Sequence, residues 1–388
     1  MRTYEQTHPW ISFQLDLRKA SFRLWMLLGE AQSKCEHMAG VPLLPGVAQH
    51  LHEIFLAKGV LATTAIEGNT LTEEEVLKQI EGQLKLPPSK EYLGKEIDNI
   101  VEACNSIGIA ILEGSATDLK PETIKQFNLM VLRNLPLDEK VIPGEIRSHS
   151  VVVGGYKGAP AEDCSYLLDR LCNWLNTELV PPRTDLKIAF GILKAIVSHI
   201  YIAWIHPFGD GNGRTARLVE FQILLSVGVP STAAHLLSNH YNQTRTEYYR
   251  QLGLANKMNG DIFPFIEYAL QGFVDGLKEQ VELIQAQQLH VHWINYIHEQ
   301  FHNKTGATAD RRRRLAIDLS NQVEPVPIAK VRHISPRIAE AYANKTDKTV
   351  RRDINSLERM GLLTVTDKEV RVKSETMLGF LPAARNDD

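Results

Sequence analysis

The stretch His206-Pro-Phe-Gly-Asp-Gly-Asn-Gly-Arg-Thr-Ala-Arg217 places one imidazole, one carboxylate, three glycines and two arginines within twelve residues. Apolar runs on either side, residues 190–205 and 218–227, have the length and spacing of helices, so a helix–loop–helix is predicted. The glycines would let a ligand approach the free N–H groups at the start of the second helix, where anions bind. The sequence therefore predicts a phosphate-binding loop.

The charged side chains of the loop suit the same ligand. Arg214 and Arg217, one helical turn apart, share a face for further phosphate oxygens. Asp210 supplies a hard oxygen ligand suited to Mg²⁺ on a polyphosphate. His206 is the only base in the loop with an ordinary pKa near neutrality. An ordinary turn between two core helices would need neither the histidine nor the arginines, so we favour a functional loop.

At every defined position this stretch resembles the signature of the Fic family, His-Pro-Phe-x-Asp/Glu-Gly-Asn-Gly-Arg-x-x-Arg. The resemblance implies a protein adenylyltransferase, which moves AMP from ATP, with Mg²⁺, to a Ser, Thr or Tyr hydroxyl of a target protein or of itself. It implies the following roles: His206 as catalytic base, Asp210 as metal ligand, Asn212 on the α-phosphate, Gly211 and Gly213 as backbone donors, Arg214 and Arg217 on the β- and γ-phosphates, with Thr215 and Ala216 in the same nucleotide-binding stretch.

A helix is expected over residues 46–67, ending at Gly68-Asn69, which tolerate the left-handed conformation of a helix end. Glu67 would face the negative end of its own helix dipole, and such glutamates are often merely solvated. However, Thr63-Thr-Ala-Ile-Glu67-Gly68 resembles the inhibitory motif of Fic proteins with an N-terminal inhibitory helix (class II), Ser/Thr-x-x-x-Glu-Gly/Asn. The resemblance implies that Glu67 pairs with Arg217 and restrains the enzyme.

Residues 143–160 are the one β-like segment of an otherwise helical chain, and their valines and clustered glycines predict a short hairpin. The alternative is an ordinary surface hairpin. In Fic proteins a hairpin here forms a flap that receives an extended target segment by strand addition. The resemblance places four flap residues nearest the nucleotide: Val153, Gly154, Gly155 and Tyr156.

The next candidate helix after the loop carries Tyr248, Tyr249 and Asn256. Tyr249 and Asn256 are seven residues apart and so share one face, where an aromatic ring and an amide could hold a purine. An ordinary surface helix is the alternative, but the Fic resemblance supports an adenine site. His199 lies on an apolar face and is predicted to be a hydrogen-bonded core histidine.

Composition bounds the class of protein. With 388 residues, 44% hydrophobic residues and a net charge of −3, the chain is predicted to fold into two or three domains and not to bind polyanions as a whole. Four dispersed cysteines predict reduced, buried thiols. The longest apolar stretch is interrupted by Lys194, Ser198 and His199 and the N-terminus lacks a signal-peptide pattern, so we expect a cytoplasmic protein with no membrane partner.

After Gly306 the chain changes character. Residues 335–343 and 347–360 have helix–turn–helix spacing and residues 362–372 the pattern of a wing, so this part resembles a winged helix. Val350, Ile354 and Leu357 are expected to be buried, with Lys348, Arg351 and Arg352 outward, which suits DNA phosphates. A protein partner is equally open, since Asp347, Asp353 and Glu358 would dilute the basic field.

The predicted fold is mainly α: a Fic helical bundle with a β-hairpin flap, followed by an α+β winged-helix domain. The expected parts are an N-terminal region with the inhibitory helix (1–110), the catalytic core (111–280), a helical linker (281–306) and the winged helix (307–388). Three alternatives stay open: transfer of UMP, phosphocholine or phosphate; removal of AMP as well as its transfer; and a DNA-binding regulator with a vestigial core. A homodimer is also possible.

Overall fold

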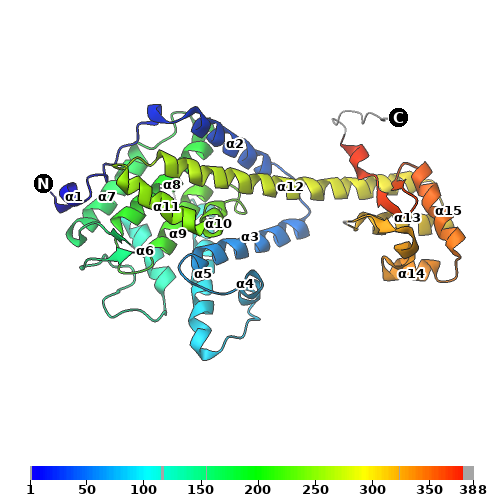
Figure 1. The fold of residues 1–388 in the computed structure, drawn as a ribbon, viewed down its shortest axis with the longest axis horizontal. Coiled ribbons are helices and arrows are strands. Elements are labelled where there is room, and N and C mark those ends of the chain that lie inside the picture. The colour runs from blue at the N-terminus through cyan, green and yellow to red at the C-terminus, as the bar shows by residue number, and fades with distance from the viewer. Residues whose placement is uncertain (1, 115–117, 154, 323, 379–388) are drawn as a thin grey trace. The chain divides into compact units, whose positions relative to one another are not determined.

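The computed structural model describes residues 2–114, 118–153, 155–322 and 324–378 (Figure 1). The chain divides into two compact units, Met1–Val281 and Glu282–Asp388. Both are mainly helical, which confirms the predicted fold class. The first unit does not separate at residue 110, so the predicted N-terminal region and catalytic core form one body.

The helices of the first unit come in chain order, with one hairpin between the sixth and the seventh. Their bounds are α1 Thr3–Thr7, α2 Phe22–Ala39, α3 Pro45–Ala65, α4 Glu73–Ile80, α5 Glu91–Leu112, α6 Pro121–Leu132, α7 Ala161–Thr177, α8 Lys187–Ile205, α9 Asn212–Ser226, α10 Leu236–Gln243 and α11 Arg245–Lys257. The hairpin pairs β1 Val152–Val153 with β2 Tyr156–Lys157, antiparallel, with Val153 opposite Tyr156. Short 3₁₀ turns lie at Leu17–Lys19, Pro88–Lys90 and Thr184–Leu186.

The core of the first unit is built on α8, which is apolar on every side and therefore must be enclosed. Helices α2, α7 and α9 pack on it, and α9 in turn contacts α3, α5 and α6. Among the described residues one helical stretch, Thr184–Ile205, is long and apolar enough to cross a bilayer, and 89% of its most apolar window is buried inside the protein. A buried core helix passes the same test.

Two local sequence signals set the position of α3. The helix begins with Pro45 in its first turn and ends at Ala65, two residues before the predicted end. The chain then turns through Gly68, whose φ of +108° is costly for any residue with a Cβ. Thr72 and Glu75 form a capping box at the start of α4. Glu67 therefore lies in the turn after α3 and is free of the helix itself.

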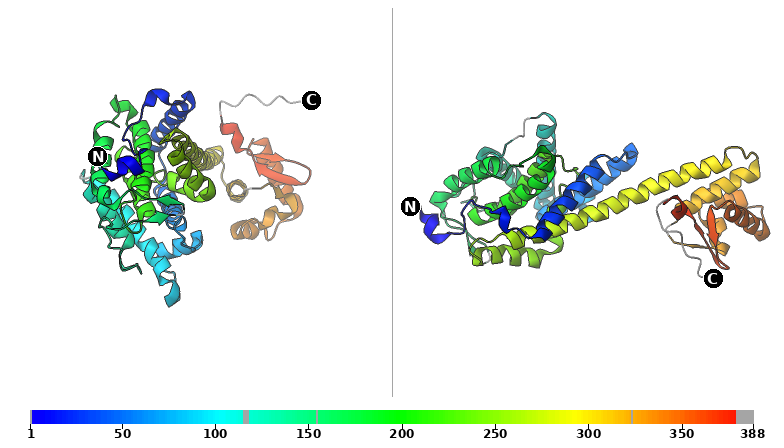
Figure 2. Two further views of the ribbon diagram at one scale, coloured as in Figure 1. Left: turned by 60° about the vertical axis from the view of Figure 1, so that its left-hand side comes forward. Right: turned by 90° about the horizontal axis from the view of Figure 1, so that it is seen from above.

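The second unit has the element order α12 (Phe263–Phe301, shared with the first unit), α13 Ala307–Ser320, β3 Val326–Pro327, α14 Pro336–Tyr342, α15 Asp347–Arg359, β4 Leu363–Val365 and β5 Glu369–Val372, with 3₁₀ turns at Ile328–His333 and Ser374–Met377. Its strands form an antiparallel sheet in the order β3-β5-β4, part of which is visible as arrows in Figure 2. Val350, Ile354 and Leu357 of α15 are buried as expected, and Lys348, Arg351 and Arg352 are exposed.

The structure refines one expectation for this unit and overturns another. Within the predicted linker (281–306), Trp293, Ile297 and Phe301 of α12 are buried in the core of the second unit. Asp353 does not dilute a surface field, because its side chain is fully buried against Arg311 and Arg312. The pattern of α12 is apolar in both halves, and sequence spacing alone does not say which core each half joins.

Candidate active site

The loop between α8 and α9 has the left-handed conformations that its sequence suggests. His206 ends α8 with φ +50° and Gly211 precedes α9 with φ +75°. A Cβ on Gly211 would lie 3.0 Å from Asn128 Nδ2 of α6, so glycine is needed there both for its φ and for space. The first-turn N–H groups of α9 follow directly, and these have no partner within the helix.

Amide side chains brace the loop from both sides. Asn212 Nδ2 donates to Phe208 O (2.9 Å), while Phe208 N donates to Asn212 Oδ1 (3.0 Å). Asn128 Nδ2 donates to Asp210 O (2.9 Å). The Asn212 side chain, predicted to contact the α-phosphate, is thus engaged in shaping the loop, and its backbone N–H remains for a phosphate. Thr215 and Ala216 are buried, and Thr215 N donates to Gly211 O, so their contact with a nucleotide stays a prediction.

Arg217 lies deep in the site and faces the turn after α3. Its Nη2 donates to Glu67 Oε1 (2.5 Å) and to Thr63 O (2.9 Å). Its side chain is fully buried, while that of Glu67 is 30% exposed. Arg217 Nε and Nη1 are buried without a hydrogen-bond partner among the described residues. Buried donors are nearly always satisfied, so these two nitrogens are suited to an oxygen of a bound ligand.

Glu67 also lies over the start of α9. A Cβ added to Gly213 would come 2.1 Å from Glu67 Oε1 and 3.2 Å from Arg217 Nη1. Burial alone would raise the pKa of Glu67, but Arg217, together with Arg214 and His206, holds that pKa below its ordinary value. The carboxylate is therefore ionised, and it occupies a helix N-terminus of the kind that binds phosphate.

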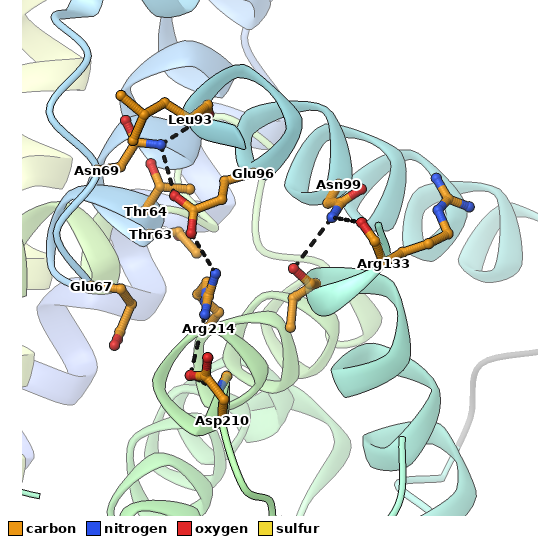
Figure 3. A network of polar contacts seen from close by, with 12 residues as sticks. Thr63, Thr64, Glu67, Asn69, Leu93, Glu96, Asn99, Arg133, Asp210 and Arg214 are labelled. Carbon is orange, nitrogen blue, oxygen red and sulfur yellow. Dashed lines mark hydrogen bonds and ion pairs between the residues drawn. The ribbon is translucent and has the colours of Figure 1, made fainter. Parts of the chain in front are cut away.

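Arg214 is held by a chain of polar contacts that sequence reasoning did not find (Figure 3). Its Nη1 donates to Glu96 Oε1 of α5 (2.8 Å), and Asn69 Nδ2 donates to the other Glu96 oxygen (2.9 Å). Asn69 also donates to Leu93 O (3.0 Å). On the opposite side Arg214 Nη2 lies 3.4 Å from Asp210 Oδ1. Asn69 follows Glu67 by two residues, so the same network fixes the turn that carries Glu67.

His206 is neutral at physiological pH in this setting. Burial first, and then the nearby Arg147 cation, lower the pKa of its imidazole to about 4, against the opposing charges of Glu67 and Asp210. A neutral imidazole can accept a proton, so the site has a base ready near neutrality.

The contacts of Asp210 leave part of its carboxylate free for Mg²⁺. The hydrogen bond from Gly211 N and the ion pair with Arg214 both use Oδ1, and the side chain is 49% exposed. Among the described residues no group of three or more His, Cys, Asp or Glu side chains could hold a metal ion. One accessible carboxylate fits Mg²⁺ that takes its other ligands from phosphates and water, as this ion commonly does.

The predicted adenine residues differ in exposure. Tyr248 is buried, and its hydroxyl hydrogen-bonds to His199 Nε2 (2.8 Å), so it presents no free polar group to a ligand. Tyr249 is 46% exposed, with its ring 5.1 Å from that of Tyr248. Asn256 Oδ1 is buried without a partner among the described residues. His199 is the hydrogen-bonded core histidine that the sequence predicted.

Each strand of the flap has two residues. Gly154, a predicted nucleotide contact, lies outside the described residues. Val152 and Val153 are exposed, as is Gly155. Tyr156 instead turns inward, and its hydroxyl donates to Trp204 O (2.8 Å). Tyr156 thus anchors the flap to the end of α8, while the valine strand remains open at its edge.

The remaining residues that sequence reasoning missed are Arg147 and Asn128, which reach the loop from elsewhere in the chain. Arg147 donates to the carbonyls of His206 and His149, and Asn128 to that of Asp210. The sequence offered only two signals that could have pointed to these residues: an arginine beside the hairpin and an asparagine on an apolar helix face. All four cysteines are free and buried, as predicted.

Comparisons with known proteins agree with this geometry. Residues 118–224, which contain the loop, match the Fic/DOC family. The protein adenylyltransferase fic-1 of Caenorhabditis elegans is 31% identical over 209 residues, 54% of this chain and 38% of that protein. The protein adenylyltransferase Fic of Drosophila ananassae is 30% identical over 207 residues, 53% of this chain and 38% of that protein. The chain thus spans well under half the length of these relatives.

Solved structures share the fold. A Fic family protein from Desulfovibrio desulfuricans G20 aligns with a TM-score of 0.55 and 21% identity, covering 91% of this chain and 96% of that one. Residues 134–508 of Fic-1 from C. elegans align with a TM-score of 0.56 and 24% identity, covering 68% of this chain and 73% of that one. The signature loop lies within the matched segment, and the helices around it match those of solved Fic proteins. Residues 118–224 therefore form a Fic domain.

Proposed function

We propose that this protein transfers AMP from ATP to a hydroxyl group of a target protein and that Glu67 restrains the reaction. The observation that carries the proposal is the Glu67–Arg217 pair over Gly213, because it puts a carboxylate where a helix N-terminus and a buried arginine are suited to phosphate. The names of the relatives, which are protein adenylyltransferases, favour ATP as co-substrate.

The chemistry follows from the positions of the residues. His206 takes the proton of the target hydroxyl, and the oxygen attacks the α-phosphorus of ATP. The bond from the α-phosphorus to the oxygen that bridges to the β-phosphorus then breaks, and pyrophosphate leaves. Backbone N–H groups at the start of α9, together with Arg214 and Arg217, hold the phosphates in line. Such transfers depend mostly on positioning and charge neutralisation. Mg²⁺ held by Asp210 would neutralise phosphate charge.

Glu67 would restrain this reaction by occupying Arg217. ATP could still bind through its adenine at Tyr249 and Asn256, but with its γ-phosphate displaced. The α-phosphorus would then be misaligned, and a misplacement of about 1 Å can cost ~10²-fold in rate.

The test is Glu67→Gly, assayed with α-labelled ATP, Mg²⁺ and a lysate as substrate. We expect AMP transfer to rise by ~10²-fold, with little change in ATP affinity. Glu81→Gly is the matched control, because Glu81 is an exposed glutamate at the end of α4. Equal transfer rates for the wild type and Glu67→Gly at saturating ATP would show that Glu67 does not restrain the reaction.

The same assay separates the alternatives. γ-Labelled ATP reports phosphate transfer, labelled UTP and CDP-choline report UMP and phosphocholine transfer, and loss of label from modified target reports AMP removal. Absence of every transfer by Glu67→Gly would favour a regulator with a vestigial core.

We further propose that the second unit is a winged-helix module that recognises a partner. Its support is the strand order β3-β5-β4 and the exposed basic residues of α15. A gel shift with duplex DNA at low and moderate salt tests the DNA option, since phosphate contacts weaken steeply with salt. If Arg351→Glu with Arg352→Glu leaves DNA binding unchanged, α15 is not the contact surface.

A further inference from the structure

Arg147 lies at the point where the chain enters the flap, and only 5% of it is exposed. Its backbone N–H donates to Pro207 O (3.0 Å), and the preceding Ile146 forms a β-bridge with Phe208. The entry to the flap is thus fastened, by main-chain contacts, to the loop that carries His206.

The guanidinium group of Arg147 reaches four backbone carbonyls. Nε donates to His206 O (2.7 Å) and Nη1 to His149 O (2.6 Å). Nη2 donates to Ala159 O and, at 3.4 Å, to Ile205 O. His149 and Ala159 lie on the two legs of the hairpin, while Ile205 and His206 form the end of α8. One planar group therefore joins both legs of the flap to the backbone of the histidine.

All four acceptors are carbonyl dipoles, and two of them belong to the negative end of α8, which stabilises a nearby cation. The carbonyls lie in different directions, and the planar guanidinium of arginine has N–H groups fixed in a fork that can reach them together. The ammonium group of lysine has no equivalent geometry. The contacts therefore select arginine for its shape as well as its charge.

The flap leg also touches the histidine directly. A Cβ on Gly158 would lie 2.9 Å from His206 Cβ and 3.0 Å from Arg147 Nη2. Gly158 N donates to Val151 O (3.1 Å), and Ala159 N donates to Trp204 O (3.3 Å). Any rotation of the hairpin would break these contacts together, since the space beside His206 is filled.

We propose that Arg147 is a positioning residue for the transfer reaction, which clamps the flap at a fixed distance and angle from the imidazole of His206. A target segment laid along the exposed valine strand would then present its hydroxyl to a base that moves with the flap as one body. This inference rests on the proposed function for its kinetic consequence, but the clamp itself can be measured without any transfer.

The charge of Arg147 has a second effect on the same base. The charged groups that act on His206 are Arg147, which lowers the pKa of the imidazole, and Glu67 and Asp210, which raise it. Removing the cation should raise that pKa, so the acid limb of the pH–rate profile should move to higher pH. A residue that only supported the fold would not move this limb.

The experiment uses the full chain with Glu67→Gly as parent and compares Arg147→Lys with Arg147→Gln. The first substitution keeps the charge and loses the fork, and the second loses both. Arg133→Gln is the matched control, because Arg133 pairs with Glu102 on the exposed surface. The readouts are amide hydrogen exchange of Gly158 and Ala159, the pKa of His206 by NMR, ATP affinity, and kcat and KM for transfer.

With Arg147→Lys we expect faster exchange of both amides and kcat lowered by ~10²-fold, as for a misplacement of about 1 Å, with unchanged ATP affinity and His206 pKa. With Arg147→Gln the His206 pKa should rise as well. If Arg147→Lys has the same amide exchange rates and the same kcat as the parent, the clamp is wrong. This milder variant provides the test even if Arg147→Gln does not fold. Should the parent transfer no AMP while the lysine variant still exchanges faster, the clamp stands and the proposed chemistry falls.

Discussion

The two units each contain a buried cluster of arginine and carboxylate, and the clusters differ in how completely they are satisfied. In the second unit Asp353 accepts from Arg311 Nε (2.8 Å), Arg312 Nε (2.7 Å) and the Tyr342 hydroxyl (3.1 Å). In the first unit Arg217 has one carboxylate, Glu67, and two guanidinium nitrogens without a partner among the described residues.

The origin of each carboxylate differs too. Asp353 lies within α15 and is fully buried, so it can leave its arginines only if the unit opens. Glu67 lies in a turn beyond α3 and is 30% exposed, so water can take its place. A closed network stabilises a fold, whereas an open one with spare donors is suited to exchange one anion for another. The difference separates a closed structural cluster from one that is suited to bind a ligand, without reference to any motif.

The largest effect should come from breaking the closed cluster. Asp353→Ala leaves the buried Arg311 guanidinium and the Tyr342 hydroxyl without their carboxylate. It also takes one partner from Arg312, which is 23% exposed and keeps its contact with Ser356. The second unit should lose about 3–5 kcal/mol of stability. AMP transfer by the Glu67→Gly protein should not change. Hydrogen exchange resolved by residue would show the loss in residues 282–378 alone.

Asp347→Ala is the control, since Asp347 is exposed at the start of the same helix and its loss should cost less than about 1 kcal/mol. Equal losses for the two aspartates would contradict the view that the buried network, and not helix charge, supports this unit.

The next largest effect should come from Arg217. In the Glu67→Gly background, Arg217→Ala should lower AMP transfer by ~10²–10³-fold, the usual cost of removing one preorganised donor. The Glu67→Gly substitution should not rescue it, because in the proposed reaction the arginine serves the phosphate as well. Initial rates with α-labelled ATP measure this, with Arg133→Ala as the surface control. Retention of most of the activity would mean that Glu67 acts on some group other than Arg217.

The smallest effect concerns pH. Burial lowers the pKa of His235, which stacks on Phe221, to about 4. The unfolded chain takes up this proton near pH 6.5 and the folded chain does not, so stability should fall as pH drops from about 6.5 towards 4. At pH 5 the loss should be roughly 1–2 kcal/mol for this group.

Urea unfolding of the wild type and His235→Gln at pH 7 and pH 5 would measure this loss. The substitution should shrink the difference between the two pH values. If that difference stays the same, His235 is not the group whose protonation lowers the stability. The buried neutral histidine of the first unit would then have no effect on stability to set against the effect of the paired charges in the second unit.

The sequence by itself determined the helix–loop–helix around His206, the turn at Gly68, the hairpin near Val152 and the inward face of α15. Each depends on neighbours a few residues apart, through left-handed glycines, capping side chains and helical spacing. It also placed Glu67 and Arg217 in two motifs. The resemblance implied that they pair, but only the fold brings them to 2.5 Å across 150 residues of sequence.

Only the tertiary structure decided which groups around the loop were satisfied. Glu96 behind Arg214, Arg147 beneath His206 and Asn128 at the carbonyl of Asp210 come from helices and loops whose local patterns read as packing. It also showed that Asn212 braces the loop with its side chain and that Asp353 is buried. These features depend on which elements meet in space, and the free energy of a buried polar group depends on partners that local sequence does not specify.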